Sequence, residues 1–253
     1  MDVAQTLIVV VGSFGVGVLG GLLGVGGGVF LVPFLVFFDV AAPKMAVAVS
    51  LCCVICTSAA AGLVSGRSGV ARLSTALKLE PALVAGAVAA SVWGARIKDG
   101  TLLVGFGALI LAVAGLIALR RRFGVGDDIP WSRGRLGVML VLGFFTGTAS
   151  GLFGVGGGVL LVPALVLVGR WPLKPAAATS SLCLMTSAAA GAAIHHSQAA
   201  LQIDLVAAAI LGVLPGGFAG ARLQGLVSEA VLERVFITMA LVVASVSVWR
   251  GLG

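Results

Sequence analysis

The chain has 253 residues, of which 60% are hydrophobic and only 10% are charged, and its formal net charge is +7. Soluble domains carry about 25% charged residues, so this composition excludes a soluble fold of this size. The positive charge does not indicate nucleic-acid binding, because the Lys and Arg residues lie mostly in short breaks between apolar runs. The composition therefore predicts a multi-pass membrane protein whose surroundings are a lipid bilayer.

A membrane-spanning helix needs about 20 mostly apolar residues, and the chain contains ten apolar segments. The N-terminal segment has no basic start and no cleavage site of small residues, so it is expected to be a span rather than a cleaved signal. The second and seventh segments are short and begin in glycine. In chain order the segments cover residues 3–20, 24–38, 45–65, 81–97, 101–119, 135–150, 154–169, 176–194, 203–221 and 231–249.

The two halves of the chain are expected to be repeats. The phrase GLLGVGGGVFLVP begins at Gly21 and returns 130 positions later, at Gly151, as GLFGVGGGVLLVP, with eleven of thirteen positions identical. The same offset aligns Ser50 with Ser180. Matches that recur in the same order along both halves indicate a duplication.

The repeats define the predicted organisation of the chain. We expect a first repeat at residues 1–119, a cytoplasmic linker at residues 120–134 and a second repeat at residues 135–253. Each repeat holds five segments, an odd number, so the second repeat should enter the membrane inverted. Twelve Lys and Arg residues follow odd-numbered segments and four lie on the other side, so the positive-inside rule places the linker in the cytoplasm and both termini outside. The predicted fold class is an all-α polytopic membrane protein with two inverted repeats and short broken helices at the GVGGG motifs.

The GVGGG motifs are the main candidate for chemistry. Glycine inside a helix costs about 1 kcal/mol relative to alanine, so three consecutive glycines predict a helix break in each half. The short helix that follows each break would present free N–H donors and partial positive charge, which suit an anion. Breaks at matching places in inverted halves indicate a transporter site near the membrane midplane. The alternative is that small residues only let helices pack closely. The candidate residues are Gly26, Gly27, Gly28, Gly156, Gly157 and Gly158.

Hydroxyl side chains form a second candidate group. Ser50 and the pair Thr179-Ser180 lie near the starts of their segments and are matched across the repeat, so they could add hydroxyl donors to the anion site. Serine and threonine in helices commonly bond a carbonyl of the preceding turn instead. That second behaviour is expected for the four hydroxyl residues further along the same segments, namely Thr57, Ser58, Thr186 and Ser187.

The four cysteines all lie in apolar runs, where cysteine is most often a small buried hydrophobe. Because Cys53 aligns with Cys183, an alternative function is a membrane thiol–disulfide conduit in which these two residues exchange. The acidic residues are expected at segment ends or in loops, which argues against a cation site or an intramembrane proton relay. The pair His195-His196 has no carboxylate or cysteine at metal-ligand spacing and is expected in a loop. We predict no metal and no cofactor.

The GxxGxGGGxxxxP phrase in each half is followed by Ala48-Val49-Ser50 or by Ala178-Thr179-Ser180. This combination resembles the sulfite exporter TauE/SafE family of membrane permeases, and the resemblance covers nearly the whole chain. It implies a non-enzymatic transporter of the bacterial or archaeal cytoplasmic membrane, carrying small sulfur-containing anions such as sulfite, thiosulfate or sulfonates. The first half departs from the second because Val49 stands where the second half has a threonine.

Overall fold

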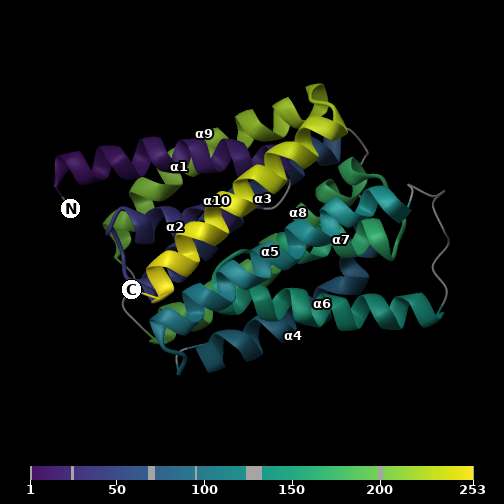
Figure 1. Cartoon of the computed structure of the whole chain (residues 1–253), viewed down its shortest axis with the longest axis horizontal. Coiled ribbons are helices and arrows are strands. Elements are labelled where there is room, and N and C mark those ends of the chain that lie inside the picture. The colour runs from purple at the N-terminus through teal and green to yellow at the C-terminus, as the bar shows by residue number, and fades with distance from the viewer. Residues whose placement is uncertain are drawn as a thin grey trace.

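The computed structural model describes residues 2–23, 26–67, 72–94, 96–123, 133–198 and 202–252. Within these ranges the chain forms α-helices and contains no strand, which confirms the all-α prediction (Figure 1). The helices are α1 (Val3–Leu23), α2 (Gly28–Phe37), α3 (Pro43–Arg67), α4 (Leu73–Gly94), α5 (Asp99–Phe123), α6 (Arg133–Phe153), α7 (Gly158–Leu167), α8 (Leu173–Gln198), α9 (Ile203–Leu226) and α10 (Glu229–Leu252).

Seven of the described helices are long and apolar enough to cross a membrane, namely α1, α3, α4, α6, α8, α9 and α10. This confirms a multi-pass membrane protein. Helices α2 and α7 have only 10 residues each, which is about 15 Å of helix at 1.5 Å per residue. The hydrocarbon core of a bilayer is about 30 Å thick, so each of these two helices covers about half of it.

One predicted segment differs clearly from its helix. The fourth segment was expected at residues 81–97, whereas α4 begins at Leu73 and contains Pro81 in its interior. The first turns of α4 carry the charged Lys78 and Glu80, which lower the hydropathy, while other side chains of the same turns are buried. The expectation that acidic residues lie at segment ends or in loops is therefore wrong for Glu80, because an amphipathic helix start resembles a loop in hydropathy.

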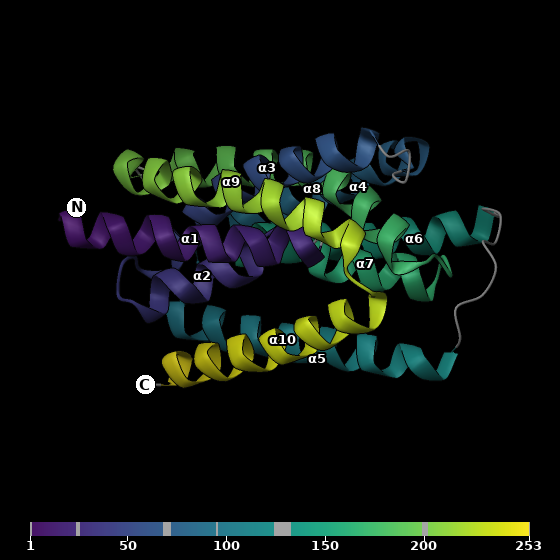
Figure 2. The same cartoon turned by 90° about the horizontal axis from the view of Figure 1, so that it is seen from above.

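Helices α3 and α8 pack against each other at the centre of the bundle (Figures 1 and 2). Within the most apolar stretch of each helix, 67% of α3 and 61% of α8 is buried, against 39–44% for the other candidate spans. Helices α3 and α8 are therefore the innermost pair. Around them α1 packs along α9, α4 packs along α6, and α5 packs along α10. The outer pairs thus join helices of the first half to helices of the second.

The short helices turn back along the helices that precede them. Phe34, late in α2, packs against Gly12 in the first half of α1, so the two helices run antiparallel. Gly157, directly before α7, packs against Thr146 of α6. Each glycine motif is therefore the turn of a helical hairpin, and the two hairpins carry the motifs into the interior of the bundle.

The N- and C-terminal ends of the chain lie at the same end of the bundle, and the end of α5 and the start of α6 lie at the other (Figure 2). Helix α5 continues to Phe123 and α6 begins at Arg133, so both ends of the predicted linker are helical. The middle of that linker, residues 124–132, lies outside the described residues. The repeat boundaries and their inverted orientation stay predictions.

Candidate functional site

Both predicted helix breaks are present, and their backbone explains why glycine occupies them. The φ angles are 82° at Gly26, 67° at Gly27, 72° at Gly156 and 77° at Gly157. This left-handed region is accessible to glycine but is disfavoured for residues with a Cβ atom. Gly27 and Gly157 are the N-caps of α2 and α7. The motifs therefore form tight turns that lead into the two short helices.

The two breaks meet inside the bundle. The α-carbon of Gly28, at the start of α2, packs directly against the carbonyl oxygen of Gly154, which follows the end of α6. The hydroxyl of Ser50 on α3 donates a hydrogen bond of 2.7 Å to the same carbonyl oxygen. Residues from both halves of the chain thus join at one point.

The backbone amides of the second break are unsatisfied. The carbonyl of Gly157 accepts hydrogen bonds from the N–H groups of Leu160 and Leu161, at 3.1 Å each. No residue in the described part of the chain accepts a hydrogen bond from the N–H groups of Gly156, Gly157 or Gly158. A buried polar group without a partner costs about 1–3 kcal/mol. These donors are available to a ligand that accepts hydrogen bonds.

Two hydroxyls that were not predicted for the site face the first break. The hydroxyl of Thr57 donates to the carbonyl of Gly26 at 3.0 Å and also lies 3.2 Å from the carbonyl of Cys53 in its own helix. The Ser58 hydroxyl oxygen lies 3.6 Å from the place where a Cβ on Gly26 would be. Ser58 is 1% exposed and has no hydrogen-bond partner among the described residues. The expectation that Ser58 bonds a carbonyl of its own helix is therefore wrong.

The sequence did contain a signal for this face. Positions 50, 54, 57 and 58 recur at the spacing of one helix face, so Ser50 and Ser58 lie on the same side of α3. In α8 the hydroxyls of Thr186 and Ser187 do bond carbonyls of their own helix, at 3.1 Å and 3.3 Å. The two halves therefore differ in how many hydroxyls they offer to the break.

The pair Thr179-Ser180 is divided between two environments. The hydroxyl oxygen of Thr179 accepts the backbone N–H of Arg72 at 3.0 Å, which ties α8 to the residue before α4. Ser180 is fully buried, and its hydroxyl has no partner among the described residues. Thr179 thus serves a helix contact, whereas Ser180 has an unused hydroxyl like that of Ser58.

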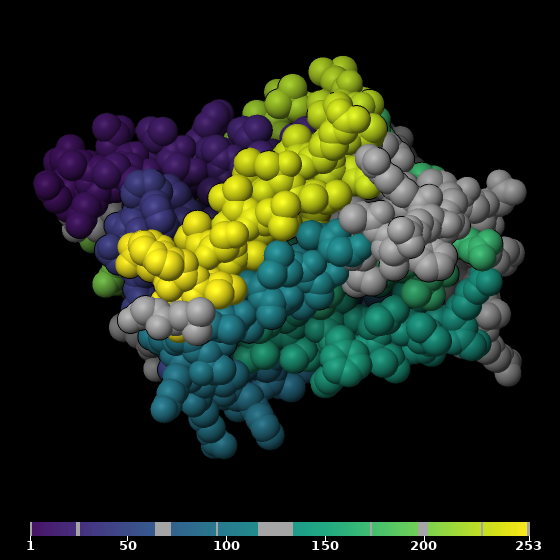
Figure 3. Space-filling view, viewed as in Figure 1, coloured from purple at the N-terminus to yellow at the C-terminus, as the bar shows by residue number. Residues whose placement is uncertain are grey.

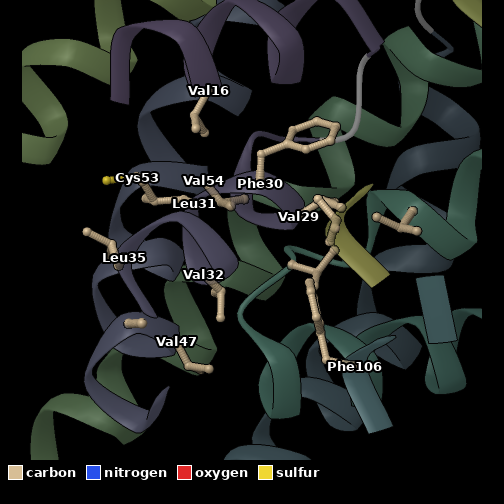
Figure 4. Close-up of a cluster of buried hydrophobic side chains, with 14 of the residues drawn as sticks. Val16, Val29, Phe30, Leu31, Val32, Leu35, Val47, Cys53, Val54 and Phe106 are labelled. Carbon is tan, nitrogen blue, oxygen red and sulfur yellow. The ribbon is translucent and has the colours of Figure 1, made fainter. Parts of the chain in front are cut away.

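All nine predicted site residues are buried. The face in Figure 3 is formed largely by α10 and α5, which lie across the interior helices. Figure 4 shows the apolar side chains around the first break, among them Val29, Phe30 and Val54. The junction of the two breaks is therefore closed to solvent in this conformation.

The cysteines occupy separate places. Cys53 belongs to the larger apolar cluster, which includes residues of α1, α2, α5 and α10 (Figure 4). Cys183 belongs to a second cluster with α4, α6 and α7, and its sulfur lies 3.9 Å from the carbonyl of Ala76. All four cysteines are free thiols. This arrangement gives no support to an exchange between Cys53 and Cys183.

The histidine pair lies in the last turn of α8 rather than in a loop, so that expectation is wrong. His195 Nε2 is 3.0 Å from the carbonyl oxygen of Gly151, the first residue of the second glycine phrase. With the proton on Nε2, the ring donates to that carbonyl. Across the part of the chain that the structure describes, no group of three or more His, Cys, Asp or Glu side chains is placed to hold a metal ion.

Charged residues gather at the end of the bundle where the termini lie. Arg250 donates to both carboxylate oxygens of Asp39, at 2.9 Å and 3.0 Å, and to the carbonyl of Phe37 at 2.7 Å. This hydrogen-bonded guanidinium lowers the pKa of the Asp39 carboxyl below its ordinary value. Lys44 pairs with Asp99 at 3.8 Å. Three of these four charged residues line a cavity of about 370 Å³ between the ends of α2, α5 and α10.

Comparison with known proteins places this architecture in a family. The family described as "Sulfite exporter TauE/SafE" matches residues 9–246. A probable membrane transporter protein of Xylella fastidiosa (strain 9a5c) is 31% identical, over 97% of this chain and 96% of its own length. The probable membrane transporter protein YunE of Bacillus subtilis (strain 168) is 26% identical, over 94% and 93%. No solved structure matches the chain at a significant level. The chain, an all-helical multi-pass protein with two glycine breaks that meet in its interior, belongs to the TauE/SafE family of membrane transporters.

Proposed function

We propose that this protein carries small sulfur-containing anions, such as sulfite, thiosulfate or sulfonates, and binds them where the two glycine breaks meet. The observation that carries the proposal is the convergence of Gly28, Ser50 and Gly154 beside the unsatisfied amides of Gly156–Gly158. The family description names sulfite export, and the chemistry of the junction suits an oxyanion.

The donors at the junction are uncharged. Backbone N–H groups and the hydroxyls of Ser58 and Ser180 would each donate to one oxygen of the anion, and the N-terminal ends of α2 and α7 would add partial positive charge. Transport requires binding that is weak enough for release, and donors without a full charge meet that requirement. A closed junction is one state of an alternating-access cycle, in which one half of the protein rocks against the other. The interfaces between the halves, among them the pairs α1 with α9 and α4 with α6, would then have to shift during the cycle.

The membrane potential favours export of a cytoplasmic anion. A negative-inside potential contributes about 2.3 kcal/mol per charge for each 100 mV. If the loops rich in Lys and Arg face the cytoplasm, as the positive-inside rule indicates, the cavity beside Asp39 opens to the outside. Export is accordingly the proposed direction.

The test is anion flux in proteoliposomes that contain the purified protein. We expect Gly157→Leu to abolish sulfite and thiosulfate flux, because Gly157 has φ 77° and Thr146 occupies the space beside it. Gly137→Leu is the matched control, since nothing lies within 4 Å of a Cβ at Gly137, and it should keep the wild-type flux. Unchanged flux in Gly157→Leu, with wild-type protein that is active, would exclude the site.

A second variant keeps the test valid if Gly157→Leu does not fold. Ser180→Ala removes one buried hydroxyl, adds no volume and breaks no hydrogen bond with a described residue. We expect it to elute as a monodisperse protein in detergent and to bind sulfite more weakly. Wild-type protein that carries none of the three anion types would contradict the proposed substrate class.

A further inference from the structure

Val54 lies at the middle of α3 and is fully buried. Its two methyl groups pack against three glycines of both motifs. A Cβ built on Gly26 would be 3.2 Å from Val54 Cγ1, and one on Gly28 would be 2.8 Å from Val54 Cγ2. On the other side, Val54 Cγ1 presses still closer against Gly156. One aliphatic side chain therefore fills the space between the two breaks.

Leu184 is the residue 130 positions after Val54, and it lies on α8. It is also fully buried, and its Cδ1 atom lies 3.0 Å from the Cβ position of Gly26. Since α3 and α8 are the innermost helix pair, each contributes one aliphatic side chain to the same junction. Sequence reasoning did not single out either residue, because a valine or leucine in an apolar segment has no distinguishing local signal.

These two side chains lie beside polar groups that have no hydrogen-bond partner among the described residues. The unpartnered hydroxyl of Ser58 is 3.6 Å from the same Cβ position of Gly26. Gly156, whose amide has no hydrogen-bond partner among the described residues, packs against Val54 on the other side. Methyl groups accept no hydrogen bonds, so they leave these donors unsatisfied at an energetic cost. An oxyanion in place of the methyl groups would satisfy them.

We infer that Val54 and Leu184 form an apolar gate that covers the anion site and sets the size of the anion that the transporter accepts. The inference rests on the proposed function. In the closed state the gate separates the two breaks. An anion reaches the donors only when α3 and α8 shift and these two side chains withdraw, so their bulk limits how large a passing group can be.

The size limit is tested by comparing uptake of sulfite with uptake of the larger sulfoacetate in proteoliposomes. We expect Val54→Ala to raise the ratio of sulfoacetate to sulfite uptake by about tenfold, since removing methyl groups from a pocket typically changes discrimination by this factor. Val49→Ala is the matched control, because Val49 is a fully buried valine of the same helix, and it should keep the wild-type ratio.

The outcomes separate the gate from the proposed function. If the wild-type protein carries sulfite and Val54→Ala has the same ratio as Val49→Ala, the gate is wrong and the proposed function stands. If the wild-type protein carries no sulfur anion, the proposed function fails. The existence of the gate is then tested by measuring the leakage of chloride from vesicles. The double variant Val54→Ala, Leu184→Ala should then make vesicles leak, and leakage no greater than that of Val49→Ala overturns the gate.

Discussion

The hydroxyl of Ser50 in the first half bonds the carbonyl of Gly154 in the second half at 2.7 Å, across 104 positions of sequence. Its repeat counterpart Ser180 is equally buried but has no partner among the described residues. Two residues that the sequence aligns thus have different roles in this conformation. Ser50 holds the breaks together, and Ser180 presents a free donor.

We expect Ser50→Ala to destabilise the protein. The substitution removes a buried hydrogen bond between the halves, which contributes about 1 kcal/mol, and the melting temperature should fall by about 2–4 °C. Thermal unfolding of the detergent-purified protein measures this. Ser245→Ala serves as the control, because Ser245 is exposed and bonds the carbonyl of Leu241 in its own helix. Equal melting temperatures of the two variants would show that the contact adds no stability.

We expect Ser180→Ala, in contrast, not to destabilise the protein. Removing a buried hydroxyl that has no partner should leave the melting temperature unchanged or raise it. Sulfite affinity should nevertheless fall, by about fivefold to tenfold if one hydrogen bond to the anion is lost. Binding to the detergent-solubilised protein and thermal unfolding are measured on the same preparation. If the variant keeps wild-type affinity for sulfite, Ser180 does not bind the anion.

The contact between Asp39 and Arg250 predicts a pH dependence. The pKa of the Asp39 carboxyl is lowered by the guanidinium of Arg250. The pair therefore contributes to the stability of the folded protein above the pKa that Asp39 has in the unfolded chain, and this contribution is lost as the pH falls through the pKa of the folded state. The ordinary pKa of an aspartate carboxyl is 3.8, so the pair should stay intact at neutral pH and break only in acid below that value. NMR titration of the labelled Asp39 carboxyl measures the pKa. In Arg250→Gln it should rise toward 3.8, and an unchanged value would contradict the pairing.

The separate locations of Cys53 and Cys183 predict that neither thiol takes part in transport. The double variant Cys53→Ala, Cys183→Ala removes both sulfurs with little change in volume, and we expect its sulfite flux to be within about twofold of wild type because each residue acts as a small buried hydrophobe. If the double variant folds but loses sulfite flux, the alternative function as a thiol–disulfide conduit is supported instead. Folding is checked by size-exclusion chromatography.

Several features followed from the sequence by itself. The scarcity of charged residues excluded a soluble fold, and the apolar segments predicted helices because hydropathy and helix length are local quantities. The breaks at Gly27 and Gly157 were predictable for the same reason, since a left-handed backbone at consecutive glycines is a property of a few neighbouring residues. The family resemblance rested on the same phrase.

The tertiary structure alone decided which residues meet. Thr179 and Ser180 are neighbours in sequence, yet one is bound by Arg72 and the other is unpartnered, because the helix turns them toward different neighbours. The position of Val54 between the two breaks depends on how α3 and α8 pack, and no local pattern distinguishes that valine from the others in α3. Contacts between residues about a hundred positions apart arise from close packing of whole helices, so the junction, its closure and its unsatisfied donors became visible only in the folded chain.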